Sequence, residues 1–373
     1  MAYLGEDIRK LGFGLMRLPT TGDEIDIEQT KQMVDMFMEA GFTYFDTAYV
    51  YGGDKSEKAI KEALVDRYPR ESFQLATKLA AWAGVKTAEE AKQEFFTSLE
   101  RTGAGYFDFY LLHNLGNDRS KLYEEWGLWD FVAKLKKQGL IKHVGFSMHD
   151  GPEALEGLLK AHPEAEFVQL QINYVDWESD NVQSRKCYEV ARKYDKPVII
   201  MEPVKGGYLA DLPADVAEPL KKLAPEASPS SWAIRYAASL EGLIAVLSGM
   251  SSIEQMQDNL NTMRDFKPLN EAEYAAVAEV VERMNAIERI PCTKCQYCVK
   301  NCPQQINIPG AFSAMNDLLV YGSEAKAKKS YDFEMRKGGK ACDCIACGQC
   351  EAACPQHINI IEQLKKCSAQ VDC

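Results

Sequence analysis

The stretch FTYFDTAYVYG, residues 42–52, joins a short apolar run to a polar segment that carries reactive groups. Its first four residues predict a buried strand. Asp46 and Tyr51 follow the carboxyl end of that strand, where a buried strand does not otherwise choose polar residues. Two later apolar runs end in the same way, at Lys78 and at His113. Polar residues at the carboxyl ends of successive strands indicate a site built along one edge of a parallel sheet.

Short apolar runs alternate with amphipathic helical segments from residue 11 to residue 263. In one such segment Ala91, Phe95 and Leu99 recur every three to four positions, as on one face of a helix. Strand–helix alternation favours parallel βαβ units, and eight units over about 260 residues fit a (β/α)8 barrel. The predicted strands lie at Gly12–Met16, Phe42–Phe45, Phe73–Ala76, Phe107–Leu112, Ile141–Phe146, Phe167–Ile172, Val198–Met201 and Leu243–Leu247.

A doubly wound open sheet is the competing α/β architecture. It places a glycine-rich turn directly after the first strand, and the segment after Met16 contains none. We therefore predict a (β/α)8 TIM barrel over residues 1–285. A charged helical stretch, Asn270–Arg289, and then Ile290-Pro291 lead out of the barrel into two Cys-x2-Cys-x2-Cys-x3-Cys-Pro motifs. Because this spacing resembles that of bacterial ferredoxins, residues 286–373 are expected to form a small, mostly helical iron–sulfur domain of the ferredoxin type.

Eight of the twelve cysteines form two copies of one pattern in this second domain. This is the ligand spacing of bacterial two-cluster ferredoxins, in which the fourth cysteine of each motif serves the other cluster. That resemblance implies two [4Fe-4S] clusters. A zinc site is the less favoured alternative, because four-cysteine zinc sites pair two Cys-x2-Cys elements and need no third cysteine at that spacing. The copies are Cys292-x2-Cys295-x2-Cys298-x3-Cys302-Pro303 and Cys344-x2-Cys347-x2-Cys350-x3-Cys354-Pro355, so the implied ligand sets are Cys292, Cys295, Cys298 and Cys354 for cluster one and Cys344, Cys347, Cys350 and Cys302 for cluster two.

The composition and charge of the chain indicate which partners and which cell compartment to expect. The net charge of −12 opposes binding to a nucleic acid, and 46% hydrophobic with 26% charged residues is ordinary for a globular protein. No apolar run approaches the length of a membrane span, and the first residues lack the pattern of a secretion signal. We expect a cytoplasmic protein without a membrane or nucleic-acid partner. Paired cysteine motifs in a reducing cytoplasm indicate cluster ligation rather than disulfides.

The chain resembles the aldo-keto reductase family over approximately residues 5–265. The resemblance is carried by the motif Asp46-Thr47-Ala48-x-x-Tyr51-Gly52, followed along the chain by the strand-end Lys78 and the strand-end His113. The resemblance implies reduction of an aldehyde or ketone to an alcohol by NAD(P)H. Tyr51 would be the acid, and because a free tyrosine titrates near 10, Lys78 would lower its pKa. Asp46 would hold Lys78 charged, and His113 would place the substrate carbonyl.

The same resemblance implies the residues that contact the cofactor, with three departures. Met148 stands where the family has an amide-binding Asn, Met201 where it stacks an aromatic ring, and neutral Gln255 where an Arg often reads the 2′-phosphate. NADP(H) is favoured by resemblance only, NAD(H) stays open, and a flavin is a less favoured alternative. The implied contacts are Ser147, Gln171 and Met201 at the nicotinamide, and Lys205, Gly206, Ser251, Gln255 and Asn259 at the phosphates and adenosine.

These patterns leave two functions open. The first is carbonyl reduction of a small molecule by the tetrad, with the clusters as a structural or regulatory addition. The second is electron transfer, in which the clusters pass electrons to or from a barrel-bound nicotinamide, flavin or substrate, with a redox partner protein such as ferredoxin. Clusters carry one electron and nicotinamide carries two as hydride, so the second function needs an intermediary. Because exposed [4Fe-4S] centres are commonly labile to oxygen, we expect an anaerobe.

Overall fold

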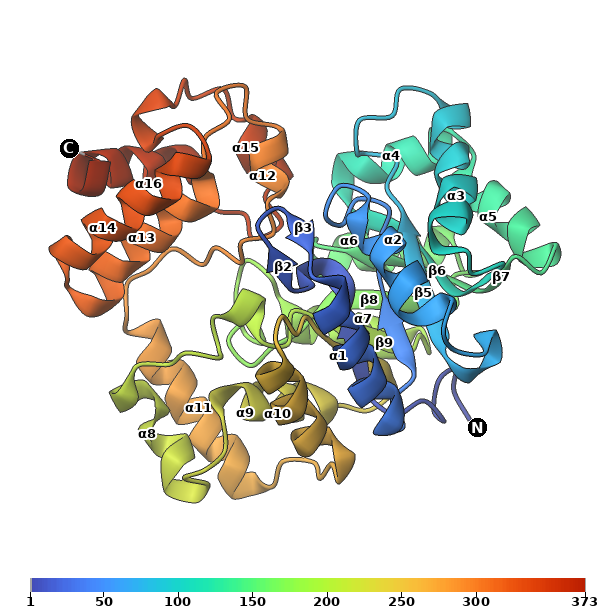
Figure 1. The fold of residues 1–373 in the computed structure, drawn as a ribbon, viewed down its shortest axis with the longest axis horizontal. Helices are drawn as coiled ribbons and strands as arrows, with labels where there is room; N and C mark the ends of the chain where they lie inside the picture. The colour runs from blue at the N-terminus through green and yellow to red at the C-terminus, as the bar shows by residue number, and fades with distance from the viewer. Residues whose placement is uncertain (1, 373) are drawn as a thin grey trace. The chain divides into compact units, whose positions relative to one another are not determined.

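Eight parallel strands close into a barrel in the order β1-β10-β9-β8-β7-β6-β5-β4. Several of them, β5 to β9, are labelled in Figure 1. The structure is a computed structural model that describes residues 2–372, apart from the side chains of Asn117, Asp118 and Tyr321. The barrel strands are β1 (Leu11–Gly14), β4 (Tyr44–Asp46), β5 (Gln74–Leu79), β6 (Phe107–Leu115), β7 (Ile141–Met148), β8 (Phe167–Gln171), β9 (Val198–Met201) and β10 (Leu243–Ser248). The predicted fold class is confirmed.

Helices return the chain between the strands and cover the barrel with their apolar faces. Local signals fix where several of them begin and end: Asp26 caps α1, Thr87 caps α3, and Gly103 ends α3 in the left-handed conformation. The covering helices are α1 (Ile27–Glu39), α2 (Lys55–Ile60), α3 (Ala88–Thr102), α5 (Leu128–Lys137), α6 (Pro152–Ala161), α7 (Ser184–Lys193), α9 (Pro229–Ala238) and α10 (Ile253–Arg264). A two-stranded hairpin, β2 (Thr20–Thr21) and β3 (Glu24–Ile25), and the helix α4 (Asn117–Glu125) are additions to the barrel plan.

The chain forms two compact units. The first, Met1–Val204 with Ala227–Tyr274, contains all eight barrel strands. The second, Lys205–Glu226 with Ala275–Cys373, combines the cysteine region with the segment that directly follows β9. The domain boundary at residues 285 and 286 stays a prediction. In the described part of the chain, no helix is both long and apolar enough to span a membrane.

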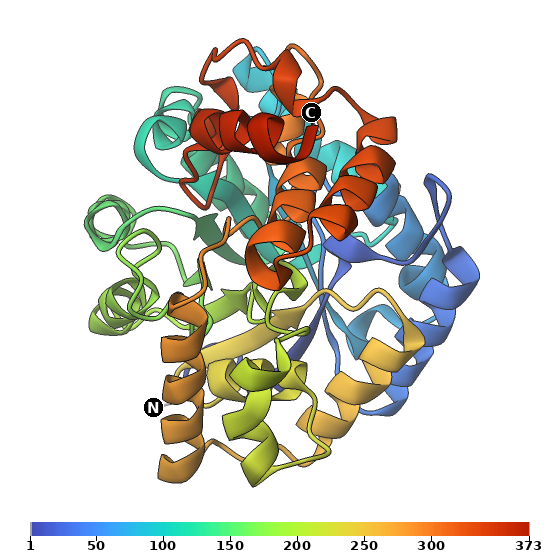
Figure 2. The ribbon, with the colours of Figure 1, turned by 90° about the vertical axis from the view of Figure 1, so that its left-hand side faces the viewer.

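In the second unit, α8 (Ala214–Leu223) lies beside α11 (Glu271–Asn285) over the part of α11 that follows Tyr274, as Figures 1 and 2 both show. Arg283 joins the two helices by an ion pair to Glu218, with 2.9 Å between nitrogen and oxygen. The cysteine region is mostly helical and has its own core, built around Phe312, Met315 and Leu364. Its helices are α12 (Tyr297–Lys300), α13 (Ile308–Tyr321), α14 (Glu324–Glu334), α15 (Gln349–Ala353) and α16 (Ile360–Cys367).

Candidate functional site

The four predicted tetrad residues meet at the carboxyl ends of three adjacent strands. Asp46 is the last residue of β4, Lys78 lies in β5 and His113 in β6, while Tyr51 stands in the turn after β4. Because β4 pairs with β5 and β5 with β6 in parallel register, these strands end side by side. This is the face of a (β/α)8 barrel on which active sites are built.

Asp46 and Lys78 form a buried ion pair. The Lys78 Nζ donates to Asp46 Oδ1 over 2.5 Å and to the Thr47 carbonyl over 2.7 Å. The two side chains are 3% and 0% exposed. Burial raises the pKa of Asp46 and lowers the pKa of Lys78, and the charge of each partner opposes the other's shift. The pair is therefore held by mutual attraction in a site that would otherwise favour the neutral forms.

Tyr51 lies against both Lys78 and His113. The ammonium of Lys78 is 4.9 Å from the centroid of the Tyr51 ring, and the His113 ring meets it edge-on at 6.0 Å. Burial raises the pKa of Tyr51 well above its ordinary value; Asp46 and Glu202 add to the rise, and Arg17 opposes it. The lowering of this pKa that the sequence leads us to expect is thus not seen in the protein alone, because desolvation is the largest effect and the charges of Asp46 and Glu202 act in the same direction.

His113 is held neutral by burial, and its backbone is held in place by two hydrogen bonds to its carbonyl oxygen. Burial lowers its pKa well below the ordinary value, with the charges of Lys78, His149 and Arg119 acting in the same direction. The carbonyl accepts hydrogen bonds from Trp82 Nε1 at 3.0 Å and from the Tyr123 hydroxyl at 2.7 Å. The ring atom Nδ1 of His113 is buried and has no hydrogen-bond partner among the described residues. A neutral imidazole can donate from one nitrogen to a carbonyl oxygen.

The predicted nicotinamide contacts lie at the ends of β7, β8 and β9. The Ser147 hydroxyl accepts the Asn114 N–H at 2.9 Å and keeps its own hydrogen to donate. Gln171 donates from Nε2 to Asp176 Oδ2 at 2.8 Å, and its Oε1 lies 3.2 Å from His149 Nδ1. Both polar atoms of the Gln171 amide are therefore already in contact with barrel residues, and its oxygen has a second lone pair with which to accept a hydrogen bond.

Met201, the third predicted nicotinamide contact, also makes a contact within the barrel, through its sulfur. The Gln169 side chain points its Nε2 at the Met201 sulfur over 3.6 Å. Sulfur is a weak acceptor, so this contact orients the side chain more than it stabilises it. A thioether in this place can pack against a ring without stacking flat on it.

The predicted adenosine contacts lie at and after the end of β10. The Ser251 N–H donates to Gln255 Oε1 at 2.7 Å, and the Ser251 hydroxyl donates to the Arg17 carbonyl at 2.6 Å. Asn259 is buried and donates to the Ser248 hydroxyl at 2.7 Å. Gln255 is exposed, whereas the Asn259 amide is already hydrogen-bonded within the barrel.

The two remaining predicted contacts, Lys205 and Gly206, belong to the second compact unit. Lys205 is buried, and both residues adopt the left-handed backbone conformation, with φ of 47° and 66°. Left-handed residues other than glycine are uncommon and cluster at ligand sites. Glu202, one residue after β9, is a third such residue, with φ of 55°.

The structure adds residues that the sequence does not reveal as parts of the site. Tyr123 acts through its hydroxyl, which binds the carbonyls of Leu79 and His113 and so ties β5 to β6. Arg17 and Glu202 act through charge on Tyr51. No spacing or motif identifies such residues, because a tie to a backbone carbonyl or a charge at several ångströms needs no fixed position in the sequence.

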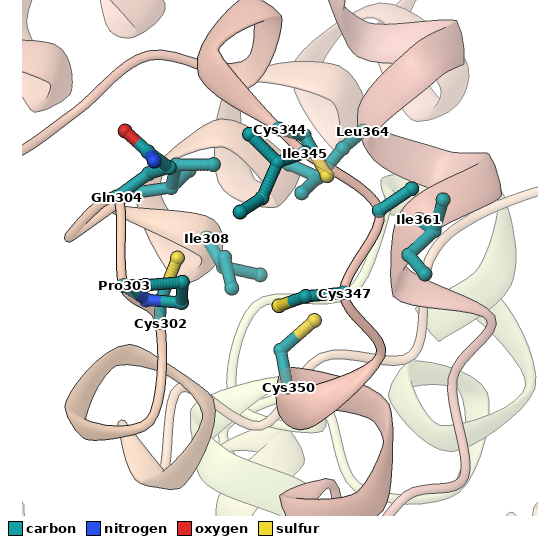
Figure 3. A pocket seen from close by; sticks show the side chains of 12 residues that line it. Cys302, Pro303, Gln304, Ile308, Cys344, Ile345, Cys347, Cys350, Ile361 and Leu364 are labelled. Carbon is teal, nitrogen blue, oxygen red and sulfur yellow. The ribbon is translucent and has the colours of Figure 1, made fainter.

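In the second unit, one cavity is lined by four cysteines from both motifs: Cys302, Cys344, Cys347 and Cys350. Figure 3 shows Cys302 on one side of this cavity and Cys347 and Cys350 on the other. Cys347 is exposed, and the neighbouring Ile345 is 59% exposed. The four cysteines are the ligand set that the ferredoxin spacing implies for cluster two.

A second cavity is lined by Cys292, Cys295, Cys298 and Cys354, the set implied for cluster one. Ile308 lines both cavities. In residues 2–372 no three His, Cys, Asp or Glu side chains gather as they would around a single metal ion. Burial raises the pKa of the Cys298 thiol well above its ordinary range, and the neighbouring cysteines add to the rise. A cluster must therefore displace protons when it binds here.

The two cysteine motifs have the same backbone plan. Left-handed residues occur at Lys294 and Ala346, at Gln296 and Gly348, and at Gln305 and His357, which are equivalent positions of the two copies. Four of the five side-chain-bearing residues among these six are neither Asn nor Asp nor His, the types that tolerate this conformation best. Such turns direct successive backbone N–H groups into a concavity that suits an anionic group, and Fe–S sites are one example.

Comparison with known proteins gives two family matches. The model described as "Aldo/keto reductase family" matches residues 10–282, and the model described as "4Fe-4S dicluster domain" matches residues 291–359. An aldo-keto reductase of Mycolicibacterium smegmatis is 33% identical over 146 residues, which cover 38% of this chain and 48% of that protein. The match thus spans about half the length of this relative. An uncharacterized oxidoreductase of Schizosaccharomyces pombe is 26% identical over 269 residues, which cover 68% of this chain and 81% of that protein.

Solved structures of similar proteins show the same barrel. An aldo/keto reductase from Klebsiella pneumoniae, solved in complex with NADP and acetate, matches with a TM-score of 0.59 and 20% identity. The match covers 74% of this chain and 92% of that chain. At this identity the likeness establishes the fold alone.

Proposed function

Because this chain belongs to the aldo/keto reductase family, we propose that it reduces the carbonyl group of a small molecule to an alcohol with NAD(P)H. The observation that carries the proposal is the packing of Tyr51 against Lys78 and His113 beside the buried Asp46–Lys78 ion pair. A proton donor, a cation and a neutral hydrogen-bond donor at one carboxyl-end site are the groups that a developing alkoxide requires.

The nicotinamide, when bound, supplies the hydride. Tyr51 donates its hydroxyl proton to the carbonyl oxygen as negative charge develops there. Its raised pKa keeps the hydroxyl protonated at neutral pH, so the acid form is always present. His113, held neutral, donates a hydrogen bond to the same oxygen and orients the substrate. Lys78 supplies positive charge next to the tyrosine, which stabilises the phenolate formed after proton transfer.

Replacing Tyr51 by Phe removes the proton donor and keeps the ring. Loss of a general acid costs about 10²–10⁴-fold in turnover, so aldehyde-dependent oxidation of NADPH by Y51F should fall by that factor. The visible absorption of the clusters serves as the control for folding and should be unchanged. Turnover within a few-fold of the wild-type value would rule out Tyr51 as the acid.

The cofactor is proposed to be NADP(H), with NAD(H) as the alternative. Ser147 retains a hydrogen to donate to an amide. Lys205 is a buried cation in the loop after β9, the seventh barrel strand along the chain, where phosphate sites of these barrels are built. Exposed Gln255 offers a 2′-phosphate a neutral partner only. Comparing KM for NADPH and NADH in the wild type and in Q255R decides between the two: a fall in KM for NADPH alone would place residue 255 at the 2′-phosphate.

We also propose that the second unit holds two [4Fe-4S] clusters, with Cys292, Cys295, Cys298 and Cys354 at one and Cys302, Cys344, Cys347 and Cys350 at the other. Four thiols line each cavity, and three of each set come from one motif and the fourth from the other. The donor set therefore fits cluster ligation. Iron and sulfide analysis of anaerobically purified protein, with zinc measured alongside, tests this proposal.

Electron transfer through the clusters is the second candidate function. Exposure of Cys347 and Ile345 favours it, because a cluster must come close to the surface to exchange electrons with a partner such as ferredoxin. NADPH added to the oxidised, anaerobic protein without a carbonyl substrate distinguishes the functions. Bleaching of the cluster absorption would favour electron transfer, with a flavin or another intermediary required. Steady aldehyde reduction without bleaching would favour carbonyl reduction alone.

A further inference from the structure

In the second unit, the loop that follows β9 lies directly against one of the cysteine motifs. At Gly206 an added Cβ atom would stand 2.5 Å from the carbonyl oxygen of Thr293 and 2.8 Å from its Cα. Both of these are backbone atoms, which cannot move aside as a flexible side chain can. Gly206 also has a φ of 66°, so this position requires glycine for two separate reasons.

A second contact joins the same two segments. The Arg289 guanidinium lies 3.6 Å from the centroid of the Tyr208 ring, which is a close cation–π distance. The segment from Lys205 to Tyr208 is thereby fastened at two points to the segment that enters the first cysteine motif, and Thr293 is itself buried.

Thr293 stands between Cys292 and Cys295, two of the cysteines around the cluster-one cavity, and Thr293 lines that cavity too. When Cys292 and Cys295 bind a cluster, the backbone between them is fixed at both ends. Lys205, next to Gly206, is the proposed phosphate-binding cation. One backbone contact therefore connects a cluster loop with a loop proposed to hold the cofactor's phosphates.

We propose that Thr293 is a positioning residue for the loop Lys205–Gly207, so that the redox state of cluster one and the binding of dinucleotide phosphates influence each other. The proposal rests on the proposed function, and it involves no electron transfer between cluster and cofactor. Coupling of this kind is reciprocal: if reduction of the cluster changes the affinity for a ligand, the ligand changes the midpoint potential by the equivalent amount.

The test uses a ligand that has the phosphates but no ring able to accept hydride. Midpoint potentials of the wild-type clusters are measured by EPR-monitored titration in the absence and presence of saturating 2′,5′-ADP, with ADP as the probe for an NADH-type site. Calorimetry on the oxidised protein reports whether each probe binds. The C347S variant, which removes a proposed ligand of cluster two, assigns the signals.

Binding is expected to shift the potential of cluster one, and not that of cluster two, by about 40 mV or more in either direction. This corresponds to an affinity ratio of about fivefold for a one-electron couple, the lower end of typical coupling. Heat of binding without such a shift would overturn the coupling and leave the proposed function standing. If neither probe binds, both the coupling and the proposed cofactor are refuted. Equal shifts of both clusters would refute a path through Thr293 and indicate a general effect of charge.

Two glycine variants separate contact from backbone strain. Both Gly206 and Gly207 have positive φ, 66° and 92°, but an added Cβ at Gly207 meets nothing within 4 Å. G206A should therefore change the shift of cluster one, while G207A, with similar strain, should retain it. Equal loss of the shift in both variants would contradict the role of the Gly206–Thr293 contact. If G206A does not fold, the wild-type titration still decides the matter.

Discussion

Glu94 on α3 is a buried carboxyl group beside the strand that carries Lys78. It is 2% exposed, its Oε2 accepts the Ala80 N–H at 2.7 Å, and its Oε1 has no hydrogen-bond partner among the described residues. Burial raises its pKa from 4.5 to about 7; Glu57 adds to the rise, while the Ala80 N–H and Arg101 oppose it. Glu94 therefore takes up a proton in the folded protein at a pH where the unfolded chain has lost it.

The sign of the effect on stability follows from proton linkage. Between pH 4.5 and pH 7 the folded state binds more protons at Glu94 than the unfolded state, so this contribution to stability is present at low pH and is lost as the pH rises through 7. With these two pKa values the contribution is about 1.4 kcal/mol at pH 6 and close to zero at pH 8.5. In Glu94→Gln the side chain does not titrate, so the variant lacks this loss.

The free-energy difference between E94Q and wild type should therefore grow in favour of E94Q by about 1.4 kcal/mol from pH 6 to pH 8.5. For a unit of barrel size this is a change of about 3–6 °C in the difference between their melting temperatures. Thermal unfolding followed by circular dichroism under anaerobic conditions measures it, and the pH dependence of all other groups cancels in the difference. E100Q, a change at an exposed glutamate of the same helix, is the matched control. A difference between E94Q and wild type that is the same at both pH values would refute the reasoning.

Two further predictions concern the ion pair and the cluster ligands. Lys78→Met leaves Asp46 buried without its partner and should lower the free energy of unfolding by about 3–5 kcal/mol. The double variant D46N/K78M should recover part of this loss. Urea unfolding of both single variants and the double variant measures the coupling, and additive losses would contradict the buried pair. C347S and C354S should each lower the iron content from about eight to about four atoms per chain and remove a different EPR signal. C342S is the control, because Cys342 is exposed and lines neither cavity. This variant should retain both EPR signals, and the loss of either signal would show that Cys342 is a cluster ligand.

The barrel could be predicted because parallel strands that are buried on both faces are nearly continuous apolar runs. Val198–Met201 agrees with β9 to the residue, and the other strands agree to within two residues at each end, except β5 and β6, which end three residues later than predicted. These two strands contain residues of the predicted tetrad. The apolar runs end at Ala76 and Leu112, whereas β5 and β6 continue through Lys78 and His113. Polar residues that face the barrel interior interrupt the pattern without ending the strand.

The site was predictable in its residue types but not in its electrostatics. Asp46 and Lys78 meet because adjacent parallel strands end together, which strand order alone implies. The pKa of Tyr51 depends instead on how much water the folded site excludes and on Glu202 and Arg17, which come from distant parts of the sequence. Burial and long-range charge are properties of the assembled barrel, so a motif cannot carry them.

The Gly206–Thr293 contact bears on why a barrel of the aldo/keto reductase family would be joined to a 4Fe-4S dicluster domain. If the clusters acted only as electron carriers, each hydride would have to be divided into single electrons by an intermediary that the tetrad does not provide. A contact through backbone atoms has no such requirement, because it transmits position rather than charge. Loss of cluster one, to oxygen for example, would then release the loop that carries Lys205 and weaken cofactor binding while the Asp46–Lys78 pair stayed intact. On this reasoning the clusters would affect the enzyme through KM for the cofactor and leave the chemical step at Tyr51 unaltered.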